Sequence, residues 1–107
     1  MIIRIVKLTM REEEVETFKT YFATVCDTIR HQEGCNLLQA WQDIHNPSIF
    51  FTYSLWDSEA YLDKYRDSAF FLQFWKTVKQ WFGAKAEVWS FVKIVDSPGG
   101  VLSISSK

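Results

Sequence analysis

The sequence is poor in the residues that build metal sites and disulfide frameworks. Among its 107 residues there are only two cysteines, Cys26 and Cys35, and two histidines, His31 and His45. The cysteines lack a metal-ligand spacing, and in a reducing compartment we expect them to be buried thiols rather than a disulfide. Neither histidine stands four residues from a carboxylate-histidine partner on a predicted helix. We therefore expect no metal site made by this chain alone.

The sequence also lacks an excess of either charge and a long apolar run. The chain has twelve Lys and Arg residues and thirteen Asp and Glu residues, which gives a formal net charge of -1. This balance argues against nucleic acid or an anionic membrane surface as partner. No stretch approaches the ~18 apolar residues of a membrane span. The first seven residues alternate charged with branched side chains, unlike a signal peptide, so a cytoplasmic location is expected.

Aromatic residues, by contrast, are abundant. They make up 17% of a chain that is 48% hydrophobic, with Trp 5, Tyr 4 and Phe 9. The length fits one domain, which we place at residues 1–96, followed by a tail at 97–107 that begins with Ser97-Pro98-Gly99-Gly100. A core of this size needs fewer rings, so some are expected to line a cavity or an interface.

The periodicity of apolar residues predicts two helices. In the first, residues 15–29 repeat at steps of three and four, with Thr9 and Glu12 spaced as a capping box and Gly34 as a C-terminal glycine. The second begins at Asp57 or Ser58, runs to about residue 82 with a possible break at Asp67-Ser68, and ends before Gly83. The apolar stripe of the first helix consists of Val15, Phe18, Phe22, Val25 and Ile29.

Four segments read as strands. They cover residues 2–9, 35–44, 49–56 and 84–95, and the turn His45-Asn46-Pro47-Ser48 joins the middle two as a hairpin. The resulting order, β-α-β-β-α-β, is the split βαβ signature of an α+β, ferredoxin-like fold with two helices on one face of an antiparallel sheet.

Alternation within these strands puts large side chains on both faces of the sheet, although two helices cover only one. Three uncovered rings would bring roughly 450–750 Å² of apolar surface, against about 300–600 Å² for the largest patch of an ordinary monomer. We therefore expect a homodimer that stacks sheet on sheet. Alternatively, residues 101–105 fold back to shield the face, or cross to the partner as an edge strand. The opposed sets are Ile49, Phe51, Tyr53 and Leu55 against Phe50 and Trp56, Leu37 and Trp41 against Leu38 and Ala40, and Val88, Val92 and Ile94 against Trp89 and Phe91.

Two segments carry a resemblance to a known family. The first is Glu33-Gly34-Cys35, between a helix and a strand, and the second is residues 55–68, in which a strand ending in Trp56 is followed by an acidic cap and the pair Glu59-Ala60. Together with the element order, these segments resemble an antibiotic biosynthesis monooxygenase (ABM) domain over residues 1–96. The resemblance implies a dimeric α+β barrel.

The resemblance also implies chemistry. The superfamily includes oxygenases that act on polycyclic phenols and quinols without a cofactor, heme-degrading oxygenases, and members without an established activity. Many members have a helical histidine where this chain has Tyr65 and another near Phe70. The asparagine, tryptophan and histidine of the heme-degrading branch correspond to Lys7, Trp56 and Phe74 here. Phenylalanine cannot ligate iron, so heme is disfavoured and no cofactor is expected.

The pocket candidates each have a functional and a structural interpretation. Trp56 forms a pocket wall or packs in the core. Tyr61 and Tyr65, one helical turn apart, orient a flat substrate through their hydroxyls or simply pack. Lys7 holds a phenolate or carboxylate, or lies in water at a strand edge. The full set is Lys7, Tyr53, Trp56, Tyr61, Tyr65, Phe70 and Phe74.

Three functions follow as hypotheses. The first is an ABM-type monooxygenase that oxidises a flat aromatic or quinol-like molecule with dioxygen and without a metal; no general base is evident, so the catalytic residues are unassigned. The second is a non-catalytic dimeric protein that binds an aromatic metabolite, favoured by the absence of both helical histidines. The third is a heme-binding or heme-degrading protein.

Overall fold

A single antiparallel sheet forms one layer of the molecule. The computed structural model describes residues 1–97, and its four strands lie side by side in the order β2-β3-β1-β4. The predicted roles of residues 101–105 therefore lie outside the described residues. The strands are β1 (Ile2–Thr9), β2 (Cys35–Gln42), β3 (Ile49–Trp56) and β4 (Glu87–Phe91).

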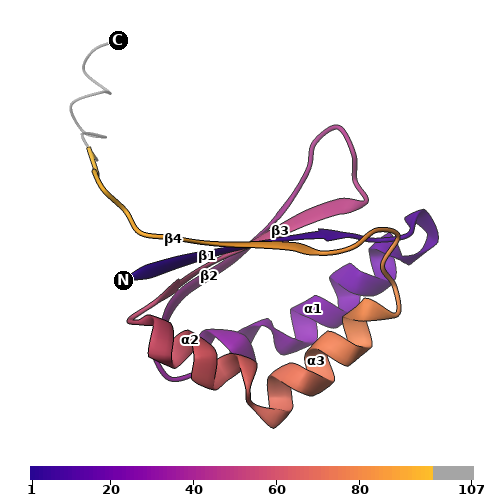
Figure 1. Cartoon of the computed structure of the whole chain (residues 1–107). Coiled ribbons are helices and arrows are strands. Elements are labelled where there is room, and N and C mark those ends of the chain that lie inside the picture. The colour runs from indigo at the N-terminus through magenta and orange to yellow at the C-terminus, as the bar shows by residue number, and fades with distance from the viewer. Residues whose placement is uncertain (98–107) are drawn as a thin grey trace.

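The helices form the second layer, and all of them cover the same face of the sheet (Figure 1). A short 3-10 turn, η1 (Glu12–Glu14), leads into α1 (Val15–Arg30), and the hairpin β2–β3 is followed by α2 (Glu59–Arg66) and α3 (Ala69–Lys79). This arrangement confirms the predicted α+β, ferredoxin-like fold, with the middle hairpin and the helical break included.

The core lies between these two layers. Its fully buried side chains are Trp56, Phe18, Leu8, Met10 and Val78. Four of the five residues in the predicted apolar stripe of α1 are buried, and only Val25 is partly exposed. Periodicity predicted this face correctly because residues three and four apart lie on the same side of a helix.

The start of the first helix differs from the prediction. Thr9 is the last residue of β1, where it pairs with Ile49, and it makes no capping box with Glu12. Arg11 precedes η1 and instead joins the turn through ion pairs with Glu13 and Glu14, at 3.3 and 3.0 Å. Thr9 lies three residues before η1 begins, whereas Arg11 stands at the N-cap position, so Thr9 is too far away to cap the turn.

The two predicted glycine stops also lie beyond the helices. α1 ends at Arg30 and α3 at Lys79, four residues before Gly34 and Gly83, respectively. Gly34 has a φ of +84°, and a Cβ at this position would lie 2.5 Å from Cβ of Tyr61. Gly34 therefore serves the turn into β2, where the chain passes closely over α2.

The break between α2 and α3 confirms the predicted capping at two serines. Ser58 begins α2 and accepts a hydrogen bond from the backbone N–H of Tyr61 at 3.4 Å. Ser68 begins α3 and accepts one from the N–H of Phe71 at 3.1 Å. Each serine has extended backbone angles, as an N-cap requires.

Two strands are shorter than predicted. β4 begins at Glu87 and ends at Phe91, which pairs with Ile3, so that only Ile2 of β1 remains beyond this pair. The predicted strand residues Val92, Ile94 and Val95 are 66–93% exposed. β2 ends at Gln42, because the side chain of Asp43 accepts hydrogen bonds from the N–H groups of His45 and Asn46 and starts the turn.

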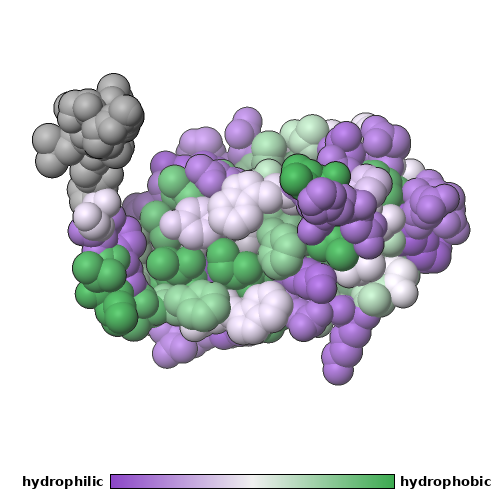
Figure 2. All heavy atoms as spheres, turned by 90° about the horizontal axis from the view of Figure 1, so that it is seen from above, coloured by the Kyte–Doolittle hydropathy of each residue, from purple (hydrophilic) through white to green (hydrophobic). Residues whose placement is uncertain are grey.

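The face of the sheet opposite the helices is apolar, as predicted. Figure 2 shows this face as a broad green-to-white area rimmed by purple side chains. We refer to it as the open face. Its large side chains are only partly buried, with Trp41 46%, Trp89 39% and Phe91 49% exposed. From β2 to β4, its residues run in three rows: Trp41, Phe51, Lys7 and Glu87; Gln39, Tyr53, Ile5 and Trp89; Leu37, Leu55, Ile3 and Phe91.

Candidate functional site

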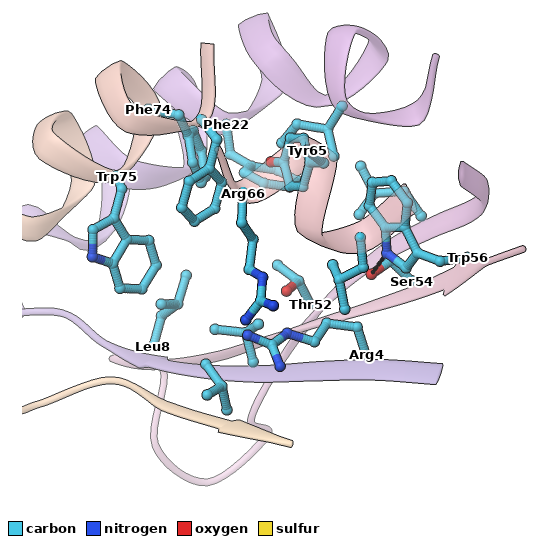
Figure 3. A pocket seen from close by; sticks show the side chains of 16 residues that line it. Arg4, Leu8, Phe22, Thr52, Ser54, Trp56, Tyr65, Arg66, Phe74 and Trp75 are labelled. Atoms are coloured by element: carbon cyan, nitrogen blue, oxygen red, sulfur yellow. Dashed lines mark hydrogen bonds between the residues drawn. The ribbon is translucent and has the colours of Figure 1, made fainter. Parts of the chain in front are cut away.

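A cavity of 130 Å³ lies between the sheet and the helices (Figure 3). The strands contribute its floor and α1, α2 and α3 its roof. Aliphatic and aromatic side chains make up most of the wall, so a ligand inside is largely removed from water. The lining residues are Arg4, Val6, Leu8, Phe22, Ile29, Leu38, Thr52, Ser54, Trp56, Leu62, Tyr65, Arg66, Phe71, Phe74, Trp75 and Val88.

Trp56 and Tyr65 form one rigid wall of this cavity. Their rings stack with centroids 5.0 Å apart and planes 24° from parallel. The indole N–H of Trp56 donates a hydrogen bond to Oγ of Ser54 at 3.0 Å, which satisfies the only polar group of a side chain that is 1% exposed. Trp56 is therefore both a core residue and a pocket wall, and its orientation is fixed by contacts on two sides.

The Tyr65 phenol is held in its protonated form. Burial raises the pKa of Tyr65 above its ordinary value, and the neighbouring Cys35 and Tyr21 raise it further. Because the desolvated site disfavours a phenolate, this hydroxyl serves as a hydrogen-bond donor rather than as a base near neutral pH.

Two arginines supply the positive charge of the cavity. Arg4 reaches in from β1, and its guanidinium donates to Oγ of Ser90 at 3.0 Å. Arg66, the last residue of α2, extends from the helical side of the cavity toward Arg4 and Thr52 (Figure 3). Its terminal nitrogen donates to Oδ1 of Asp63. Burial lowers the pKa of Arg4, the nearby charge of Arg66 lowers it further, and Asp63 raises it.

The structure separates the predicted pocket residues into three groups. Trp56, Tyr65 and Phe74 line the cavity. Phe70 and Tyr61 are partly buried and pack beside it, Phe70 by stacking on Phe74 with centroids 6.2 Å apart. Lys7 and Tyr53 lie on the open face instead, where Lys7 pairs with Glu87 at 3.7 Å and Tyr53 stacks on Trp41. The sequence alone does not show which side of each strand meets the helices, so it could not separate the cavity residues from those of the open face.

Several lining residues were not among the sequence candidates, most importantly Arg4 and Arg66. The sequence does contain a pattern that points to both arginines. Arg4 stands two and four residues before Val6 and Leu8, so it shares the helix-covered face of β1. Arg66 stands four residues after Leu62, which is 3% exposed, so it shares the buried side of α2. A charge on a buried face is the exception that marks a site.

The cavity does not fit a heme. Phe74 occupies the place that the family resemblance gives to an iron-ligating histidine, and it is 6% exposed in the wall. Within residues 1–97, no histidine or cysteine lines the cavity, and no group of three His, Cys, Asp or Glu is placed to hold a metal ion. Pockets for ligands of drug size measure about 300–1,000 Å³, well above 130 Å³.

Comparison with known proteins identifies one family model that matches this chain. The model, described as antibiotic biosynthesis monooxygenase, covers residues 1–77. Its match includes β1, the helix-to-strand turn at Gly34, the strand end at Trp56, α2 and most of α3. No curated protein matches the chain in sequence.

Solved structures share the fold. A conserved protein from Methanosarcina mazei Go1 aligns with a TM-score of 0.79 and 24% identity, over 86% of this chain and 92% of that one. A putative antibiotic biosynthesis monooxygenase from Deinococcus radiodurans aligns at 0.82 and 15%, over 91% and 96%. A third, from Nitrosomonas europaea, has the same description and aligns at 0.81 and 17%, over 89% and 100%. Among the helices of residues 1–97, none combines the length and apolar character of a bilayer span.

Proposed function

The chain belongs to the antibiotic biosynthesis monooxygenase family, and we propose that it is an oxygenase acting on a small, single-ring quinol or phenol. The observation that carries this proposal is the apolar cavity behind Trp56 and Tyr65. A flat ring placed there lies between aromatic walls and is shielded from water, which strengthens its electrostatic interactions with the protein.

The size of the cavity selects the size of the ring. A dry, apolar protein cavity of about 150 Å³ takes up one benzene molecule. At 130 Å³, this cavity holds one six-membered ring. A polycyclic substrate, which the resemblance alone would favour, exceeds this volume. We therefore place a monocyclic substrate in it.

The proposed reaction is balanced without an additional reductant. A 1,4-hydroquinone and one dioxygen yield 2-hydroxy-1,4-benzoquinone and one water. The ring loses a proton, its anion adds dioxygen at a ring carbon, and the resulting hydroperoxide loses water. The ring gives up four electrons, and dioxygen accepts all four. One oxygen atom forms a new carbon–oxygen bond, and the other leaves as water.

The residues of the cavity would contribute orientation and electrostatics. The Trp56–Tyr65 stack fixes one wall, and the protonated Tyr65 hydroxyl donates to an oxygen of the ring. Positive charge from Arg4 and Arg66 stabilises the anion that reacts with dioxygen. The guanidiniums favour the anion, and the substrate proton leaves to solvent past Arg66, whose side chain is 40% exposed.

Dioxygen uptake tests the proposal. The purified chain should consume oxygen with 1,4-hydroquinone faster than the buffer alone, at a ratio of one oxygen per hydroxyquinone formed, with one atom of labelled oxygen retained in the product. Val88→Trp, which places a large ring at the 47%-exposed rim of the cavity, should abolish this rate.

Val92→Trp is the matched control. It adds the same ring one residue beyond β4, at a position that is 66% exposed and does not line the cavity. Equal loss of oxygen uptake in both variants, or oxygen uptake by wild type no faster than buffer with a full panel of hydroquinones and catechols, would refute an oxygenase that uses this cavity.

One observation favours a second function, binding without turnover. Of the described residues that line the cavity, none is a histidine or a carboxylate, the usual general bases. The discriminating result is calorimetric binding of a hydroquinone, lost in Val88→Trp and kept in Val92→Trp, with no oxygen consumed. That outcome would support a binding protein for an aromatic metabolite and reject the oxygenase.

We also propose that the open face is the interface of a homodimer. Its three rows bring Tyr53 and Trp89 to either side of Ile5, with the Lys7–Glu87 pair at one edge, and none of the helices of residues 1–97 covers them. Contiguous apolar surface of this kind on a soluble protein marks an interaction site. A second copy of the chain supplies a matching sheet under two-fold symmetry.

A further inference from the structure

The proposed function gives the arginine pair of the cavity a role only after the ring has lost its proton. Arg4 and Arg66 both line the cavity, where most other walls are apolar. We propose that their guanidiniums form an oxyanion subsite, so that the single-ring ligand of this cavity carries a carboxylate or a phenolate that pairs with both. The inference rests on the proposed function for the ring and adds the charge of its substituent.

The hydrogen-bonding capacity of the two side chains supports this subsite. A guanidinium has five N–H donors. Among the described residues, Arg4 donates to one serine hydroxyl and Arg66 to one carboxylate. The Nε–H of Arg66 is buried and has no partner among residues 1–97. An unpaired buried donor is costly, and a ligand oxyanion placed between the two forks would satisfy it.

The charge balance of the site points the same way. Two guanidiniums face each other closely enough for Arg66 to oppose the protonation of Arg4. Within residues 1–97, only Asp63 pairs with them, and its side chain is 52% exposed. No carboxylate lines the cavity within the described residues. One positive charge is therefore left without a counterion, and a monoanionic ligand would neutralise it.

The surroundings define where the rest of the ligand lies. Figure 3 shows the two guanidiniums beside Thr52, below the rings of Phe22 and Phe74. Thr52 adds a hydroxyl at the same place. An oxyanion held there directs the attached ring toward the aromatic roof. The subsite thus selects aromatic acids or acidic phenols over neutral rings of the same shape.

A matched pair of ligands tests the charge directly. Benzoate and benzamide have nearly the same size, but only benzoate is an anion. Calorimetric titration of the full chain should show benzoate binding at least about tenfold more tightly than benzamide. Arg4→Gln and Arg66→Gln should each remove most of that difference, while Lys19→Gln, which deletes a positive charge from the outer surface of α1, should leave it intact.

A gain-of-affinity variant guards against misfolding as an explanation. Asp63→Asn removes the exposed carboxylate that competes for Arg66, so benzoate should bind about two- to fivefold more tightly.

4-Nitrophenol distinguishes a phenolate subsite from a carboxylate subsite, since its phenolate absorbs visible light. Ionisation of the bound phenol in wild type but not in Arg66→Gln assigns the subsite to phenolates; benzoate selectivity without such ionisation assigns it to carboxylates.

The outcomes separate this inference from the proposed function. Equal affinity for benzoate and benzamide in wild type, without ionisation of 4-nitrophenol, overturns the oxyanion subsite while leaving the ring cavity in place. Failure of all three to bind overturns both. Selective benzoate binding in a protein that consumes no oxygen with any quinol keeps the subsite and rejects the oxygenase.

Discussion

At the scale of single residues, the buried Ser54–Trp56 hydrogen bond fixes the cavity wall. Ser54 is 6% exposed and accepts from the indole N–H of Trp56 at 3.0 Å. Ser54→Ala leaves that N–H without a partner and should lower the free energy of unfolding by about 1–3 kcal/mol. Urea denaturation measures the change.

The phenylalanine variant of Trp56 provides the control. In a Trp56→Phe background there is no N–H to satisfy, so Ser54→Ala should then cost close to nothing. The two single changes and the double change form a thermodynamic cycle. An equal cost of Ser54→Ala in both backgrounds would show that the hydroxyl contributes through packing alone.

Tyr65 makes stability depend on pH in the alkaline range. Burial raises the pKa of its phenol in the folded state above the value near 10 of an unfolded chain. The stabilisation is complete below pH ~10 and is lost as the pH rises toward the folded pKa, since only the unfolded chain then releases the proton. In that window wild type should lose about 1.4 kcal/mol per pH unit more than Tyr65→Phe.

Urea denaturation at pH 8, 10 and 11 tests this expectation. Tyr65→Phe keeps the ring that stacks on Trp56 and removes only the ionisable hydroxyl. Tyr53→Phe removes a phenol from the open face and is the matched control. Parallel loss of stability in wild type and Tyr65→Phe across the series would contradict the account.

At the scale of elements, the turn between α1 and β2 depends on one glycine. Gly34 combines a φ of +84° with a close approach to Tyr61 of α2. Gly34→Ala should lower the free energy of unfolding by more than about 1 kcal/mol, because alanine disfavours that φ and its Cβ collides with the tyrosine. Thermal or urea unfolding measures the loss.

A second substitution separates the two causes. Tyr61→Ala keeps a Cβ but removes the ring that begins at Cγ, so it relieves part of the collision and leaves the φ unchanged. Gly34→Ala should therefore cost less in the Tyr61→Ala background. A cost that is the same in both backgrounds would assign the whole effect to the backbone angle.

Regular elements could be read from the sequence because their periodicity is local. The bounds of β1 and β3 are those predicted, and the stripe from Val15 to Ile29 faces the core. The predicted ends of the helices and strands were less accurate, because they depend on contacts with residues elsewhere in the chain. Thr9 is held in the ladder by Ile49, and β4 ends where only one residue of β1 remains beyond the last pair.

The candidate site could be predicted only in part. The sequence predicts three aromatic pocket residues that do line the cavity, namely Trp56, Tyr65 and Phe74. Arg4 and Arg66 lie far apart in the sequence, and only the packing of α2 against the sheet brings them together. The sequence shows that each shares a face with buried residues, but it does not show that the two faces meet.

At the scale of the whole molecule, the sheet separates two apolar regions. The helix-covered side encloses the cavity, and the open face is the surface that we propose as the dimer interface. Arg4 and Ile5 are neighbours in β1 but project to opposite sides, so one strand serves both. Because the sheet is shared, a change on the open face tests association without altering the lining of the cavity.

Ile5 is the most informative position on the open face. It lies between Tyr53 of β3 and Trp89 of β4, at the centre of the three rows. If two sheets stack there, Ile5→Glu buries a carboxylate without a partner, which costs several kcal/mol. Light scattering after size exclusion should give a dimer for wild type and for Lys19→Glu, an outer-surface change of α1, and a monomer for Ile5→Glu. A monomeric wild type at micromolar concentration would contradict the sheet-on-sheet dimer, and a dimeric Ile5→Glu would place the interface elsewhere.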